Sequence, residues 1–127
     1  MKNNFLSLVS ALFLSLAVTT PSAAQSISDK IEHQGASRYI KVTGLMSKVS
    51  NGFIQLQVEL SNTDYDPQKA FYRVKWLDES GFQVWDDEAW KPLLIHGNQK
   101  HNVQIVSPTN KARDFRIQFN AEKNWSN

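Results

Sequence analysis

NGFIQLQVELSN, residues 51–62, alternates apolar and polar side chains with a period of two. That pattern predicts a β-strand with one face in a core and the other in water. The two faces consist of Ile54, Leu56, Val58 and Leu60, and of Gln55, Gln57, Glu59 and Ser61. Asn51-Gly52 immediately before it favours a tight hairpin turn, because both residue types tolerate positive φ. The partner strand is expected in residues 38–50, with regular alternation that puts Ile40, Val42 and Gly44 on one face.

A second hairpin is predicted in FYRVKWLDESGFQVW, residues 71–85, around the turn sequence DESG. Alternation places Phe82 and Val84 of its return strand toward the core. Two further strands are expected near residues 101–107 and 113–121, while Pro92 excludes a central strand between them and the hairpin. The residues predicted for the core are Leu56, Val58, Val74, Trp76, Ile105 and Ile117.

Six or seven short strands with polar turns favour an all-β fold, a small antiparallel β-sandwich that is immunoglobulin-like in the broad sense. A small β-barrel is the alternative. The sandwich domain is expected to span residues 37–121, with a flexible segment at 25–36 and a tail at 122–127. Because the chain has no cysteine, it would be stabilised by its core without disulfides.

The N-terminus has the features of a signal peptide over residues 1–24. Lys2 precedes an apolar run at residues 5–18, which is short for a bilayer span, and Ala24 ends a small-residue site where we expect cleavage. An uncleaved anchor or a buried helix is the alternative. Cleavage would lower the formal charge from +2 to +1, because Lys2 is removed. So small an excess of charge is not typical of a nucleic-acid-binding protein.

Several motifs follow one another in a recognisable order after the strand that ends at Asn62. They are Trp76-Leu77-Asp78, Gly81, Trp90-Lys91-Pro92-Leu93, Gly97, Ser107-Pro108 and the strand Phe115 to Phe119. In this order the chain resembles the YcfL-like family of periplasmic proteins and lipoproteins, a domain family of unknown function. The resemblance implies a small β-sandwich in the envelope of a Gram-negative bacterium and supplies no catalytic residue. Many members carry a lipid-acceptor cysteine; this chain has none, so we expect a soluble periplasmic protein without a lipid anchor.

No motif in the sequence predicts a catalytic residue, a metal site or a cofactor. His96 and His101 flank a turn, but a structural metal site needs about four protein ligands. The carboxylates at residues 86–88 lack the alternating spacing of a calcium loop, and a G-x-S-x-G nucleophile motif is absent from the sequence. A small carboxylate-dependent hydrolase acting on an envelope glycan remains the alternative function, because carboxylate pairs can come together in space.

Trp85 and Trp90 are the strongest binding candidates, since both lie in or beside an acidic run. Trp85 follows Val84 and is therefore predicted to point away from the core. Outward aromatic side chains can stack on sugars or anchor a protein interface. The predicted partner-binding set is Trp85, Trp90, Asp86, Asp87 and Glu88, in a non-enzymatic binding or accessory module. Its partner would be an envelope protein or a peptidoglycan-related glycan; alternatively, the two tryptophans cap one end of the sandwich.

Overall fold

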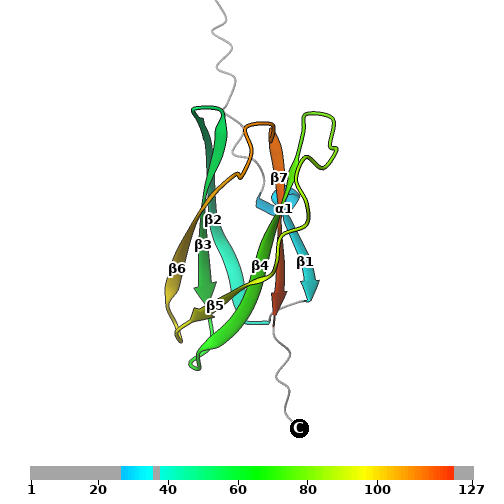
Figure 1. The fold of residues 1–127 in the computed structure, drawn as a ribbon. Helices are drawn as coiled ribbons and strands as arrows, with labels where there is room; N and C mark the ends of the chain where they lie inside the picture. The colour runs from blue at the N-terminus through cyan, green and yellow to red at the C-terminus, as the bar shows by residue number, and fades with distance from the viewer. Residues whose placement is uncertain (1–26, 36–37, 122–127) are drawn as a thin grey trace, which may run out of the picture.

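The computed structural model describes residues 27–35 and 38–121 as two stacked sheets. In chain order the elements are α1 (Ile27–Lys30), β1 (Ile31–Gly35), β2 (Ile40–Ser50), β3 (Phe53–Asn62), β4 (Gln68–Leu77), β5 (Lys91–Ile95), β6 (Lys100–Val106) and β7 (Asp114–Ala121). One sheet has the order β1-β7-β4-β5 and the other the order β2-β3-β6 (Figure 1). The predicted β-sandwich is therefore confirmed, and the barrel alternative is wrong. The predicted signal peptide and C-terminal tail lie outside the described residues.

The core lies between the two sheets and follows the alternation of their strands. In β3 every second residue, from Ile54 to Asn62, is buried and its neighbours are half-buried. Trp76 of β4 and Ile117 of β7 are the corresponding buried residues of the other sheet. All six side chains that the sequence places in the core are buried.

Strand β2 departs from the expected alternation. The turn at Asn51 and Gly52 has the predicted positive φ values, 51° and 83°, but the register with β3 shifts between Val42 and Gly44. This bulge adds one residue and reverses the inward face of the rest of the strand. Leu45 therefore packs against the core, whereas Met46 is exposed.

Residues 27–35 correct the prediction of a flexible segment at 25–36 and of a domain that begins at residue 37. They form α1 and β1, and β1 pairs in parallel with β7. Lys30 Nζ contacts Asp114 Oδ1 at 2.6 Å, and Gln118 Nε2 donates to Glu32 Oε2 at 2.9 Å. These contacts join the segment to residues more than 80 positions away and hold it in place. The segment itself is too short to show the alternation of a strand in its sequence.

The hairpin predicted at residues 71–85 is incomplete. Strand β4 ends at Leu77, and the returning chain makes one isolated bridge, between Leu77 and Gln83. Phe82, predicted to face the core, is 71% exposed, while Val84 packs against the core edge. The next strand, β5, lies at an edge of its sheet, a position that tolerates Pro92.

Candidate functional site

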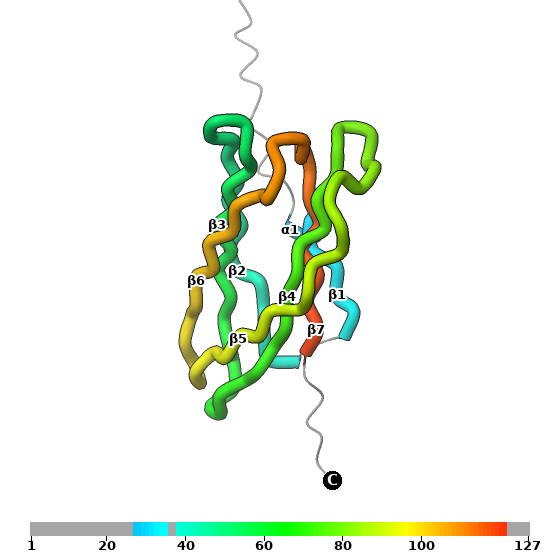
Figure 2. Tube along the Cα trace, viewed as in Figure 1, coloured from blue at the N-terminus to red at the C-terminus, as the bar shows by residue number. Residues whose placement is uncertain are grey.

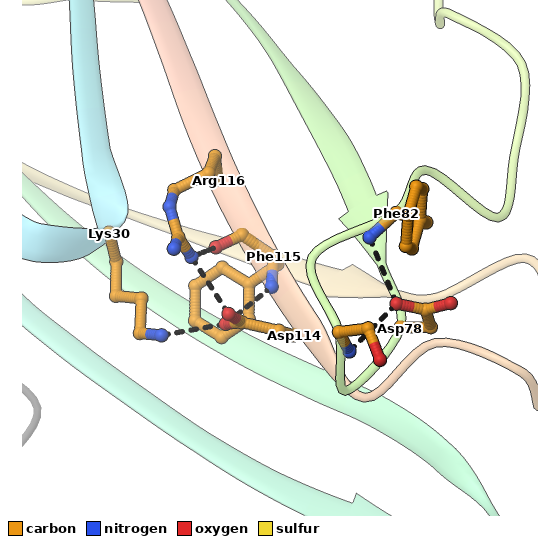
Figure 3. A network of polar contacts seen from close by, with 7 residues as sticks. Lys30, Asp78, Phe82, Asp114, Phe115 and Arg116 are labelled. Carbon is orange, nitrogen blue, oxygen red and sulfur yellow. Dashed lines mark hydrogen bonds and ion pairs between the residues drawn. The ribbon is translucent and has the colours of Figure 1, made fainter.

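The connection between β4 and β5, residues 78–90, begins with a closed turn held by Asp78. One oxygen of this carboxylate, Oδ1, accepts hydrogen bonds from the backbone N–H groups of Ser80 and Phe82, both at 2.9 Å (Figure 3). The Asp78 N–H donates to the Phe82 carbonyl at 2.8 Å, and Gly81 has a φ of 87°. Since an aspartate side chain readily bonds to the backbone two residues on, DESG folds here as a self-contained turn.

The second part of the loop is fixed by Gln83 and by the end of β4. The Val84 N–H donates to the Trp76 carbonyl at 3.0 Å, so the chain stays beside β4 for one further bond. Gln83 Nε2 donates to the Trp85 carbonyl at 2.7 Å and to Asp87 Oδ1 at 2.8 Å. These bonds define the backbone on both sides of the Trp85 side chain.

Two large aromatic side chains remain exposed on this ordered loop. Phe82 is 71% exposed and Trp85 is 45% exposed. Trp85 lies beside an open hollow whose lining residues are Gln83, Val84, Trp85, Asp86 and Asp87. We call Phe82, Trp85, Asp86 and Asp87 the aromatic–acidic surface. Phe82 was not among the sequence candidates, although the Asp-x-Ser-Gly turn before it is a signal that regular alternation breaks down there.

Glu88 and Trp90 lie elsewhere. Glu88 Oε1 accepts a hydrogen bond from the indole Nε1 of the core residue Trp76 at 3.2 Å. The guanidinium of Arg73 lies over the Trp90 ring, 4.4 Å from its centroid, and Arg73 Nε also donates to Gln118 Oε1 at 2.6 Å. Both candidates are therefore engaged within the domain and brace the end of the loop against β4.

A cluster of charges fastens the strand next to the loop. Asp114, the residue paired with Leu77, binds Lys30 at 2.6 Å and Arg116 at 3.0 Å (Figure 3). Partial burial acts to raise the pKa of Asp114, but the hydrogen bonds from Lys30, the Phe115 amide and Arg116 outweigh it, so the pKa lies below its ordinary value. The cluster therefore holds a carboxylate in its charged form.

Glu59 and Asp114 are two described carboxyl groups whose pKa lies below its ordinary value. The Thr43 hydroxyl, at 2.7 Å, and the Lys100 ammonium, at 3.3 Å, lower the pKa of Glu59. The pKa of Asp114 is lowered as well. A general acid at neutral pH needs a raised pKa, so neither group is suited to that role, and each forms an ion pair with a lysine.

The described part of the chain contains neither a group of side chains suited to a metal ion nor a helix suited to crossing a membrane. His96 and His101 are both exposed. Within residues 27–35 and 38–121, no group of three or more His, Cys, Asp or Glu side chains could hold a metal ion. None of the helical structure in those ranges is long and apolar enough to cross a membrane.

Comparison with known proteins gives a family and two similar folds. The crystal structure of Campylobacter jejuni cj0090 matches with a TM-score of 0.63 at 22% identity, over 74% of this chain and 99% of that one. The crystal structure of a DUF1425 family member from Shewanella sp. pv-4 matches with a TM-score of 0.57 at 26% identity, over 69% of this chain and 81% of that one. No curated protein matches the sequence significantly. The family model described as protein of unknown function (DUF1425) matches residues 27–121, and the chain therefore belongs to that family.

Proposed function

We propose that this protein is an exported binding module whose aromatic–acidic surface engages a protein partner in the cell envelope. The observation that carries the proposal is an ordered loop that leaves Phe82 and Trp85 exposed. The hydrogen bonds that the Asp78 carboxylate accepts and that the Gln83 side chain donates already hold the loop. A loop ordered in advance loses less conformational entropy when it binds, so its exposed rings can contribute more fully to affinity.

The chemistry of the surface favours a partner with an apolar pocket rimmed by basic residues. Tryptophan is a frequent energetic anchor of interfaces, with typical losses of about 2 kcal/mol or more on truncation to alanine. Asp86 and Asp87 are exposed beside Trp85. Exposed carboxylates of this kind chiefly raise the rate of encounter with a basic surface and select among partners.

The proposed location is the periplasm, as a soluble protein. The signal-peptide features of residues 1–24, with cleavage after Ala24, support export. The lack of any cysteine supports a form without a lipid anchor. Within its family the chain would then belong with the YcfL-like proteins. The proposed role requires no cofactor, and catalysis is not part of it.

Affinity capture from envelope extract tests the proposal by comparing variants of the protein. Phe82→Ala combined with Trp85→Ala should reduce capture of the specific partner about tenfold or more while the thermal midpoint changes by a few degrees. Tyr65→Ala is the matched control, because Tyr65 is 88% exposed in the β3–β4 connection. That connection lies at the opposite end of the sandwich from loop 78–90 (Figure 1).

Asp86→Lys should also weaken capture, chiefly at low ionic strength, and it leaves the bond from Gln83 to Asp87 in place. Equal losses with the Tyr65 control, or undiminished capture by the aromatic double variant, would refute the proposal. Co-sedimentation with purified peptidoglycan is a parallel arm. If the aromatic variant abolishes that co-sedimentation but changes no protein capture, the ligand is a glycan and the proposed protein partner is wrong.

A further inference from the structure

The four edge strands of the two sheets are not equally protected against pairing with another chain. Strand β1 is short and has a register shift between His33 and Gly35, β2 has the bulge near Gly44, and β5 is short and contains Pro92. Bulges, prolines and short length are common devices that keep edge strands from associating. Among the described strands, β6 is the edge that has neither a bulge nor a proline. Its seven residues pair with β3 in an unbroken register.

The backbone of β6 leaves one set of hydrogen-bonding groups pointing away from β3. The Asn62 N–H donates to the Gln99 carbonyl, and the Ser107 N–H donates to the Ile54 carbonyl. These two bonds flank β6 and fix which residues bond to β3, because bonded pairs alternate along an antiparallel ladder. Residues 101, 103 and 105 therefore face β3. The residues whose N–H and C=O groups face the open edge are Lys100, Asn102, Gln104 and Val106.

The open edge lies on the outside of the molecule and carries little charge that would repel a partner. In Figures 1 and 2, β6 forms the left-hand boundary of the described chain. Lys100 is the one residue of β6 with a full charge at neutral pH, and it is paired with Glu59 at 3.3 Å. At the other end of the strand Val106 is 57% exposed, an apolar side chain beside free backbone groups. Exposure of this kind on a regular edge is typical of a strand that pairs with another chain.

We propose that β6 pairs in antiparallel fashion with β6 of a second copy of this chain, around a two-fold axis at Val103. The two three-stranded sheets would then form one continuous sheet of six strands. In this register Asn102 lies opposite Gln104 of the second copy, and Lys100 lies opposite Val106 of the second copy. The interface is the same on both copies, as two-fold symmetry requires.

A second copy of β6 fits this open edge along its whole length in one register. The register centred on Val103 is the one in which all four outward-facing residues find backbone partners within β6 of the second copy. A register centred on Asn102 would bring Val106 against the turn residue Asn98, whose φ is 56°. A register centred on Gln104 would place Lys100 against Pro108, which has no N–H to donate.

Sedimentation velocity of the full chain after natural processing tests this pairing over a roughly hundredfold range of concentration, because self-association follows mass action. The wild type should pass from monomer to dimer. Gln104→Pro should abolish the dimer, since it removes an N–H that faces the open edge while the bonds to β3 remain. Gln104→Ala, the matched control, keeps that N–H and should keep the dimer.

The register itself is tested by charge at Val106, whose exposed side chain can be replaced without opening the core. Val106→Lys places like charges opposite each other twice per dimer and should raise the dissociation constant about fivefold. Val106→Glu places opposite charges there and should lower it by a similar factor. Both effects should shrink at high salt, and Val106→Gln should lie between them.

Three results would overturn the proposal. One is a wild type that stays monomeric at every concentration. Another is a dimer that survives Gln104→Pro in protein with an unchanged circular dichroism spectrum. The third is a pair of Val106 variants that change the dissociation constant in the same direction. If the chain is monomeric but binds an extended peptide from another protein along β6, the edge is used and the second copy is the wrong occupant. Because the aromatic–acidic surface shares no residue with β6, failure here is distinguishable from failure of the proposed function.

Discussion

Replacing Asn62 by alanine should destabilise the domain more than any substitution at an exposed polar residue nearby. Asn62 is the last residue of β3 and is 1% exposed. Its Nδ2 group donates to the carbonyls of Asp66 at 2.9 Å, Ile95 at 3.0 Å and His96 at 3.3 Å. Its Oδ1 accepts from the Asp64 N–H at 2.9 Å. One side chain thus joins the β3–β4 connection to the end of β5.

The expected loss follows from these contacts. An amide group has two N–H donors, so the three donated contacts share two hydrogens, and with the accepted bond they count as about three hydrogen bonds. At about 0.5–1.5 kcal/mol net each, with some carbonyls left buried, Asn62→Ala should lower the free energy of unfolding by about 2–4 kcal/mol. For a domain of this size the thermal midpoint should fall by about 10–20 °C. Urea unfolding followed by circular dichroism measures the first quantity directly.

Asn62→Asp sharpens the test because it keeps the shape and replaces the donor group. A carboxylate against three carbonyls is disfavoured, so the pKa of the introduced group should be raised and the variant should lose stability as pH rises through it. Thr63→Ala is the control, since the Thr63 hydroxyl makes one exposed bond, to the Tyr39 carbonyl at 3.1 Å. A loss below about 0.5 kcal/mol for Asn62→Ala, or equal losses at the two positions, would refute the reasoning.

Three further predictions concern the core, the charge cluster and the N-terminus. Leu56→Ala should cost about 2–5 kcal/mol in urea unfolding, because it leaves a cavity between the sheets; an unchanged midpoint would contradict its burial. Asp114→Asn should lower stability at neutral pH, and its difference from wild type should vanish as pH falls well below 3.8, where the wild-type carboxylate loses its contact with Lys30; a pH-independent difference would show that charge is not the cause. Intact mass of the periplasmic product should correspond to a chain that starts at Gln25, after cleavage at Ala24, whereas full-length protein in the membrane fraction would reject cleavage.

The parts of the fold that the sequence predicts are those in which one strand carries its own signal. Strand β3 alternates strictly, so its buried face can be assigned without knowing its neighbours. Strand β1 carries no such signal. It is five residues long, and its order depends on pairing with β7 and on the contact between Lys30 and Asp114. Both contacts join residues that lie far apart in the sequence, so the pattern of residues 27–35 by itself predicts a loose segment.

The bulge in β2 is a feature that the alternation of residues in the sequence does not predict. Up to Val42 the strand follows the predicted alternation, and beyond Gly44 the alternation continues with the opposite faces. A side chain at Gly44 would approach Cβ of Glu59 to 3.2 Å, so the close contact favours glycine at the shift. Period two is preserved on each side of the bulge, and the sequence alone does not show where one residue has been inserted.

The candidate site was predicted in part, because exposure and acidity do not distinguish residues that recognise a partner from residues that brace the loop. Trp76 is 1% exposed, and a buried indole N–H needs an acceptor. Glu88 supplies it, with its second oxygen 3.9 Å from Lys91. Asp87 also braces the loop, because its Oδ1 accepts a hydrogen bond from Gln83 Nε2 at 2.8 Å. The three carboxylates of the acidic run therefore have different roles. Truncation of Glu88 would leave the Trp76 N–H without its acceptor and would disturb the core, whereas Asp86 can change sign without breaking the bond of Trp76 or that of Gln83. Loss of partner binding on substitution of Glu88 or Asp87 would thus say little about recognition, while loss on substitution of Asp86 in a stable protein would locate the partner on this loop.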